Sequence, residues 1–321
     1  MRPVIVLVSL LLLAAAPAHA AVGFQHFTIP DPQGAPLEVG VWYPTAAEPR
    51  VEPIETDRQT VARDAPVAGG RLPLVVMSHG HGGSYAGHAD TARALANAGF
   101  VVAALSHNGD SWRDPGRPTE IWERPRQLKV LADYMVGTWR DRDHVDDGRI
   151  GAFGFSAGGF TVLAIAGGVP DLGTMGEHCR AHPDFEDCAI VARNPLPAGQ
   201  AITWTQDARI KAVVSAAPAL GFAFGRKGLE AVRQPVQLWR AENDSVLPHP
   251  YYAEAVREAL PSLPEMHVVA RAGHYDFLAP CSERLAKMAP VICTSTPGFD
   301  RAAFHAEFNA AVVAFFERKL R

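Results

Sequence analysis

The stretch Gly154-Phe155-Ser156-Ala157-Gly158 follows the apolar residues 150–155 and precedes a run of small and apolar residues. A Gly-x-Ser-x-Gly segment in this setting is typical of a sharp strand-to-helix turn that exposes the serine hydroxyl. Glycine is needed at both ends because a side chain there would collide with the adjoining backbone. We therefore predict a strand over 150–155, a helix over 158–167 and Ser156 as a nucleophile between them.

The rest of the chain alternates between strand and helix patterns. Apolar runs of strand length cover residues 72–77, 100–105, 212–216, 236–240 and 266–270. Helical periodicity covers residues 86–98, 123–139 and 301–319. Residues 22–29 and 37–43 predict a hairpin, whereas residues 44–71 lack periodicity and are expected to cross the surface. This order predicts an α/β protein with a mostly parallel sheet, helices on both faces and an antiparallel hairpin at one edge.

Residues 168–208 form a long stretch without periodicity that contains several prolines, Trp204 and two of the four cysteines. Long ordered loops in compact domains are often functional, so we expect an insertion that forms a lid or a pocket wall. An inert decoration is the alternative. We predict a single domain over residues 21–321.

The first twenty residues have the features of a signal peptide. Met1-Arg2 gives a positive start, residues 4–16 are apolar, and Ala18-His19-Ala20 is a typical cleavage site. The apolar run is shorter than the roughly 20 residues that span a membrane. We therefore expect cleavage near Ala21, a periplasmic or secreted protein, and no stable membrane insertion.

Composition argues against a nucleic-acid-binding protein, and cysteine spacing favours disulfides over a metal site. The chain has 48% hydrophobic residues, a formal net charge of −4 and dispersed basic residues, so no nucleic-acid partner is expected. The oligomeric state stays open. Short loops and an oxidising compartment favour two disulfides over a metal site, with Cys179 bonded to Cys188 and Cys281 bonded to Cys293.

A serine nucleophile needs a histidine base and a carboxylate that orients it, and these follow the serine along the chain in this motif. Asp244 and Glu242 both follow the expected strand 236–240, and Asp244 is favoured because it lies deeper in the turn. His274 lies in a loop after the last expected strand, where an imidazole can reach the serine. His267 lies within that strand, and the remaining candidate, His305, falls in the C-terminal helix.

Charge that develops on the attacked carbonyl oxygen needs preorganised donors. The backbone amide of Ala157, next to the nucleophile, is one candidate. The second is expected from the Gly-rich loop after strand 72–77, with the amide of His81 preferred and that of Gly82 as the alternative. A zinc site at His79, His81 and His88 is a rival interpretation, but it lacks a suitably spaced further ligand. We therefore predict no metal.

Residues 74–83 and 94–103, together with the serine motif, resemble the platelet-activating-factor acetylhydrolase and dienelactone-hydrolase-like branch of the α/β-hydrolases. Asp244 and Gly273-His274 fall where that branch places its acid and base, and the resemblance spans roughly residues 35–319. It implies the α/β-hydrolase fold and an oxyanion amide from His81, two residues beyond the His-Gly histidine. Ser156 departs from the cysteine of dienelactone hydrolases proper, and His81 replaces an apolar residue, which implies a more polar pocket.

These residues predict an exported serine hydrolase that cleaves small-molecule or lipid-like carboxylic esters through an acyl-enzyme intermediate, without a cofactor. The same triad in a peptidase, an amidase or a polyester hydrolase is the alternative. A binding protein that keeps only the fold is a third possibility, although all three triad positions are filled. Other candidate pocket residues share an aromatic or charged side chain near the expected strand ends. They are Trp112, Trp122, Trp204, Asp110 and Arg113.

Overall fold

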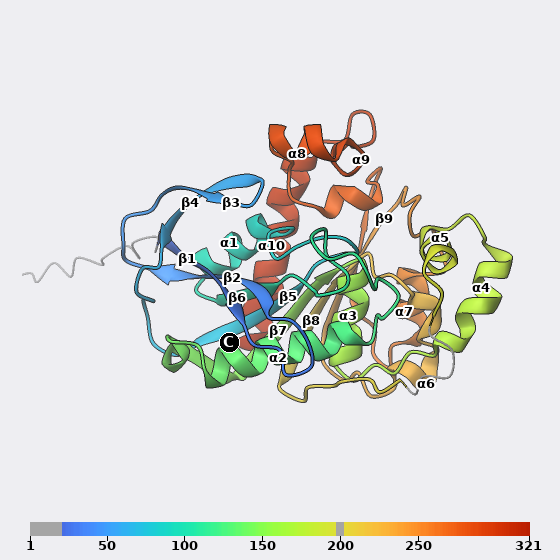
Figure 1. The fold of residues 1–321 in the computed structure, drawn as a ribbon, viewed down its shortest axis with the longest axis horizontal. Coiled ribbons are helices and arrows are strands. Elements are labelled where there is room, and N and C mark those ends of the chain that lie inside the picture. The colour runs from blue at the N-terminus through green and yellow to red at the C-terminus, as the bar shows by residue number, and fades with distance from the viewer. Residues whose placement is uncertain (1–20, 197–201) are drawn as a thin grey trace, which may run out of the picture.

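A ten-stranded sheet forms the centre of the computed structural model, which describes residues 21–196 and 202–321 (Figure 1). Its strands lie in the order β10-β9-β8-β7-β5-β6-β2-β1-β4-β3. Their bounds are Ala21–Ile29 (β1), Leu37–Thr45 (β2), Arg50–Ile54 (β3), Asp57–Arg63 (β4), Leu72–Ser78 (β5), Val101–Leu105 (β6), Val145–Phe155 (β7), Ile210–Ala216 (β8), Val236–Ala241 (β9) and Glu265–Val269 (β10).

Strands β5 to β10 pair in parallel, and β2 joins them by pairing antiparallel to β6. The hairpin of β1 and β2 continues the antiparallel part. Residues of β5 and β6 are almost entirely buried, as expected for strands covered on both faces. The predicted mostly parallel sheet is therefore confirmed, but the hairpin predicted at one edge is not outermost, because β4 and β3 extend the sheet beyond β1.

The expectation that residues 44–71 only cross the surface is wrong. Strands β3 and β4 form a second hairpin in this region, and β4 pairs in parallel with β1 at the end of the sheet. This hairpin turns at Glu55-Thr56, where Glu55 has φ +51°. It lies at an edge and buries few apolar side chains, Ile54 and Val61 among them. Such a mostly polar edge gives little periodic signal.

Helices cover both faces of the sheet, as predicted. Their bounds are Ala89–Asn97 (α1), Glu123–Gly137 (α2), Ala157–Ile165 (α3), Met175–Ala181 (α4), Glu186–Arg193 (α5), Arg226–Leu229 (α6), Ala253–Ala259 (α7), Glu283–Met288 (α8), Pro290–Cys293 (α9) and Arg301–Leu320 (α10). Short 3₁₀ helices cover Arg142–His144 (η1), Leu172–Thr174 (η2), Gly221–Ala223 (η3) and His274–Phe277 (η4). Helices α1 and α10 pack together on one face and α2 and α3 on the other, and each pair contributes to a separate apolar cluster.

The insertion predicted at residues 168–208 is not irregular throughout, because it contains α4 and α5. A disulfide between Cys179 and Cys188 joins these two short helices. A second disulfide joins Cys281 to Cys293 across α8 and α9. Both predicted pairings are therefore present. Helices this short are stabilised by such disulfides rather than by helical propensity. The apolar periodicity of the sequence was therefore too weak to predict them.

The predicted signal peptide, residues 1–20, lies outside the described residues. Within the two described ranges, no helix is long and apolar enough to cross a membrane.

Candidate active site

Ser156 lies at the tip of the turn between β7 and α3, with φ +55° and ψ −119°. Two glycines make this turn possible. A Cβ added to Gly154 would lie 2.0 Å from the carbonyl oxygen of Gly158, and one added to Gly158 would lie 1.9 Å from that of Ser78 at the end of β5. Strand, helix and neighbouring strand therefore approach more closely than any side chain allows, and the serine is forced outward.

His274 and Asp244 complete a hydrogen-bonded chain with this serine. His274 lies at the start of η4, and its Nε2 is 3.0 Å from Ser156 Oγ. Its Nδ1 is 2.8 Å from Asp244 Oδ2. The other carboxylate oxygen of Asp244 accepts hydrogen bonds from the amides of Val246 and Leu247 at 3.0 and 2.7 Å. The acid is thus held by its own turn in the orientation that the imidazole requires.

The alternative acid and the other histidines lie elsewhere. Glu242 is exposed, and its Oε2 accepts a hydrogen bond from the amide of Arg271 at 2.8 Å. The ring of His267 stacks on Trp239 within the sheet, with ring centroids 3.9 Å apart. His305, on α10, contacts Asp90 at 2.7 Å. Of the candidates from the sequence, Asp244 and His274 are the pair that reaches Ser156.

The two amides expected to stabilise an oxyanion belong to Ala157 and His81. Ala157 is the first residue of α3, so its N–H has no carbonyl partner within the helix. His81 lies in the loop after β5, and both residues line the same cavity as Ser156. The amide of Gly82 instead donates to Asp110 Oδ1 at 3.3 Å, which favours His81 over Gly82.

A buried ion pair between Arg124 and Asp110 supports the loop after β5 that carries His81. Arg124 Nη1 is 2.6 Å from Asp110 Oδ2, and another Arg124 nitrogen donates to the carbonyl of His79. Asp110 Oδ1 is also 2.5 Å from His81 Nδ1. Burial raises the pKa of Asp110, but Arg124 and His81 more than offset this, and the pKa is lowered overall. Sequence reasoning missed Arg124, because an arginine in the first turn of a helix resembles a surface residue.

The loop that carries His274 is anchored by a second buried group. Asp276 accepts a hydrogen bond from the amide of Gly273 at 2.8 Å and another from Arg301 Nε at 3.2 Å. His305 Nε2 donates to the carbonyl of Asp276 at 2.9 Å. Arg301 and His305 belong to α10, so the last helix fixes the loop of the candidate base. Nothing in the local sequence pattern indicated this contact.

Ser156 and His274 open into a cavity of about 440 Å³ with mostly apolar walls. The walls come from the β3–β4 turn, from α5 and the residues after it, and from α8 and α9, so both disulfide-linked segments take part. Several of these residues belong to the segment 168–208, whose role as a lid or pocket wall stays a prediction. Trp112 lines the cavity, whereas Trp122 is buried in the core and Trp204 packs against Phe160.

The two charged candidates after β6 differ in position. Asp110 lines the cavity, but its carboxylate oxygens already contact Arg124 and His81. Arg113 lies over the Trp112 ring, with its guanidinium carbon 4.2 Å from the ring centroid, and 3.9 Å from Glu38. His81 also lines the cavity, and the more polar pocket implied by this residue stays a prediction.

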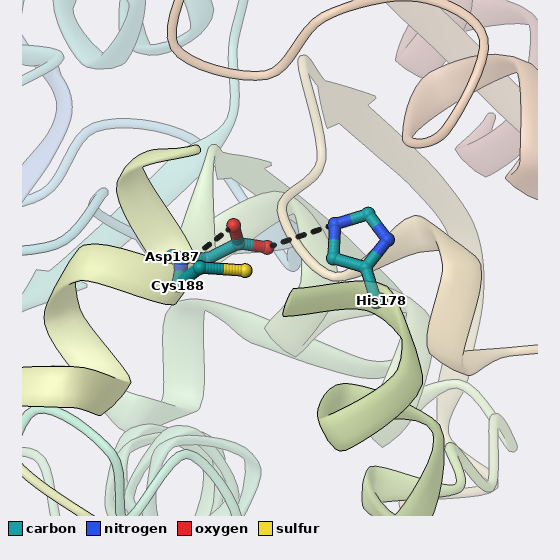
Figure 2. Close-up of side chains that lie close together, drawn as sticks. All are labelled: His178, Asp187 and Cys188. Carbon is teal, nitrogen blue, oxygen red and sulfur yellow. Dashed lines mark hydrogen bonds and ion pairs between the residues drawn. The ribbon is translucent and has the colours of Figure 1, made fainter. Parts of the chain in front are cut away.

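Two groupings of histidine and other donor residues resemble metal sites only superficially. His178, Asp187 and Cys188 lie together (Figure 2), but Cys188 Sγ is bonded to Cys179 and cannot act as a thiolate ligand. In the rival zinc interpretation, both nitrogens of His79 are engaged. Its Nδ1 donates to the carbonyl of Gly80 at 2.6 Å, and its Nε2 accepts from the amide of His107 at 2.9 Å. Neither donor set suits a metal ion.

Buried neutral histidines should make the fold sensitive to acid. Burial lowers the pKa of His88 to about 4, and neither of its ring nitrogens has a hydrogen-bond partner among the described residues. The unfolded chain takes up a proton near pH 6.5, so stability should fall as the pH drops from about 6.5 toward 4. Urea unfolding at pH 7 and pH 5 should show a loss of about 2 kcal/mol from His88 alone.

The variant His88→Leu should remove the part of this pH-dependent loss of stability that comes from His88. Its stability at pH 7 should not fall, because leucine needs no hydrogen-bond partner in an apolar site. Exposed His249 supplies the control, and His249→Gln should keep the pH dependence of the original protein. Equal pH dependence in His88→Leu and the original protein would contradict the prediction.

Comparison with known proteins adds four findings. Residues 60–189 match the model of the Dienelactone hydrolase family. Over 187 residues the chain is 29% identical to NocK of Nocardia uniformis, which its name describes as a proposed esterase; this match covers 50% of the chain and 53% of NocK. The chain therefore spans about half the length of this curated relative.

Two solved structures share the architecture. A ferulic acid esterase from Streptomyces cinnamoneus superposes with a TM-score of 0.67 at 21% identity, over 96% of this chain and 93% of that one. A dienelactone hydrolase from Anabaena variabilis gives a TM-score of 0.55 at 16% identity, over 93% of this chain and 99% of that one. At sequence identities this low, the similarity shows a shared fold and nothing about the activity.

Proposed function

Because the chain carries a dienelactone hydrolase family domain and has the α/β-hydrolase fold, we propose that it is an exported serine hydrolase that cleaves carboxylic esters. The predicted resemblance to dienelactone hydrolases is thereby confirmed, while the resemblance to acetylhydrolases stays a prediction. One observation carries the proposal: the hydrogen-bonded chain from Ser156 through His274 to Asp244 opens into an apolar cavity. The esterase names of the similar proteins support the same activity.

In the proposed mechanism, Ser156 Oγ attacks the ester carbonyl while His274 Nε2 takes the hydroxyl proton. Asp244 stabilises the imidazolium that forms, and the amides of Ala157 and His81 bind the oxyanion. His274 then protonates the leaving alcohol, and an acyl group remains on Ser156. Water, activated by the same imidazole, attacks this ester and releases the acid. Every proton passes through His274, so no cofactor is required.

The localisation and domain predictions belong to the proposal as well. We propose that residues 1–20 are a signal peptide and that residues 21–321 form one domain whose insertion at 168–208 walls the pocket. The two disulfides support a periplasmic or secreted location, because such bonds persist in oxidising compartments. Dienelactone itself is not the proposed substrate, because Ser156 stands where dienelactone hydrolases proper use cysteine.

Hydrolysis of p-nitrophenyl esters from acetate to palmitate tests the activity, with p-nitroanilides of the same acids run in parallel. We expect turnover of the esters, with an optimum at the chain length that fills the cavity, and little turnover of the anilides. Faster anilide cleavage would favour the amidase alternative. An absence of turnover on every ester, together with no labelling of Ser156 by a fluorophosphonate, would overturn the proposal.

Asp244 and Glu242 provide a matched pair for testing the acid. Asp244→Asn removes the negative charge beside His274 Nδ1 and should lower kcat by about 10³–10⁴-fold. Glu242→Gln changes an exposed side chain that accepts a hydrogen bond from the amide of Arg271, and kcat should stay within about twofold. Steady-state kinetics on one ester with both variants decides between the two acids, and the opposite pattern would assign the role to Glu242.

A further inference from the structure

The charged side chains around the cavity are of one sign. Its lining contains four acidic residues besides Asp110, namely Glu55, Asp57, Glu186 and Asp187, and no lysine or arginine from the described part of the chain. Residues 197–201, which lie outside the described ranges, contain neither lysine nor arginine. An apolar cavity with walls of this kind favours a ligand that is neutral or positively charged.

Glu55 enters the cavity wall from the β3–β4 turn, where its backbone adopts φ +51°. Ser84 Oγ donates to Glu55 Oε2 at 2.5 Å, and Trp112 Nε1 is 3.5 Å from Oε1. Both partners are neutral. Burial raises the pKa of this carboxyl group, and the hydrogen bonds from Ser84 and Trp112 offset the effect only in part. Left-handed backbone at a residue other than glycine is often retained for function.

Asp187 lines the cavity from α5, on the opposite side of the molecule from the β3–β4 hairpin (Figure 1). Tyr252 Oη donates to its two oxygens at 2.9 and 3.0 Å, and its own helix supplies the amide of Cys188 at 2.9 Å. The nearest imidazole, His178, lies 3.9 Å away (Figure 2), and burial lowers the pKa of His178 to about 4. That ring is therefore neutral at pH 7.

Within the described ranges, no lysine or arginine lies within salt-bridge distance of Glu55 or Asp187. Burying a carboxylate costs free energy when its hydrogen-bond donors are all neutral. A cation beside the carboxylate would recover part of that free energy. The structure therefore has two fixed acceptors for a positive charge within reach of the same cavity as Ser156.

We propose that Glu55 and Asp187 determine specificity by selecting esters that carry a positively charged ammonium group. This inference rests on the proposed esterase function. The apolar lining takes the hydrocarbon part of such a substrate, and the carboxylates take its charge. Anionic esters are disfavoured by the same walls.

Choline butyrate and its uncharged isostere 3,3-dimethylbutyl butyrate test the inference at pH 8, with 3-sulfopropyl butyrate as the anionic member. An acyl-side pair, the p-nitrophenyl esters of 4-(trimethylammonio)butyrate and 5,5-dimethylhexanoate, covers the other orientation. We expect kcat/KM for the cationic member of at least one pair to exceed its isostere about tenfold, as for one charge-assisted contact. The ratio should fall toward one in Glu55→Gln/Asp187→Asn and in 0.5 M NaCl.

Exposed Glu177 on α4 supplies the control, and Glu177→Gln should keep the ratio of the original protein. The same ligand pairs are titrated into Ser156→Ala by calorimetry, so that binding is measured without turnover. Preferential binding of the cation with no hydrolysis of any ester would leave this inference standing and defeat the proposed function. Hydrolysis of the neutral esters with no cation preference, or with a preference that the double variant keeps, would overturn the inference and leave the function intact.

Discussion

Ser156→Ala should lower kcat on p-nitrophenyl esters by about 10⁴–10⁶-fold, while the protein keeps its fold. The hydroxyl of this residue is hydrogen-bonded to His274, and alanine removes it without adding volume. The residual rate should reflect the oxyanion amides and substrate binding alone. Steady-state kinetics with a thermal unfolding curve for each protein measures both parts of the expectation.

Ser245, an exposed serine next to Asp244, is the matched control. Ser245→Ala also removes one hydroxyl, and its kcat should stay within about twofold of the original value because surface substitutions are usually mild. If Ser156→Ala retained a tenth or more of the original kcat with an unchanged midpoint of unfolding, another residue would have to be the nucleophile.

Gly158→Ala should cause the largest loss of stability of any single methyl added to the elbow, several kcal/mol or failure to fold. The new Cβ would lie 1.9 Å from the carbonyl oxygen of Ser78 and 2.8 Å from that of His79. Both neighbours are backbone atoms, so a rotamer change cannot relieve the overlap and β5 must shift from α3. The oxyanion loop begins at this point, so any folded fraction should also lose activity. Soluble yield, urea unfolding and kcat measure these effects.

Gly137 at the end of α2 provides the comparison, because a Cβ there would meet nothing within 4 Å. Gly137→Ala should leave activity unchanged and raise stability by up to about 1 kcal/mol, since alanine favours helix more than glycine does. A Gly158→Ala protein with normal stability and turnover would show that β5 and α3 can separate at no cost.

The sequence was sufficient for the parts of the fold that bury continuous apolar runs. Strands β5, β6, β8 and β9 each lie between turn-forming residues. The Gly-x-Ser-x-Gly segment predicted the end of β7, the turn at Ser156 and the start of α3. The order of serine, acid and histidine came from the Gly-x-Ser-x-Gly motif and the hydrolase resemblance, and the connectivity of parallel strands brings the three residues to one edge of the sheet. Asp244 was favoured over Glu242 because it lies deeper in the turn after one strand, and His274 because it lies in a loop after another.

Contacts between distant segments could not be predicted in this way. Arg124 and Arg301 are charged residues near the starts of helices, and such positions are usually solvated. Their burial depends on Asp110 and Asp276, which approach only after the sheet has formed. The β3–β4 hairpin and helices α5 and α8 were missed for another reason. The hairpin has few apolar residues and the two helices are too short to show a period, and each is ordered by a strand edge or a disulfide.

The anchoring of η4 by α10 has a consequence for the order in which activity arises during folding. The candidate nucleophile lies near the middle of the chain, but the loop of its base is held by Arg301 and His305. Phe316 of the same helix packs against Gly151 in β7, so this helix spans from the sheet to the base. A chain whose sheet has formed but whose last helix has not docked should therefore be inactive. Ester turnover would then report completion of folding at the C-terminal helix, later than any probe of the sheet.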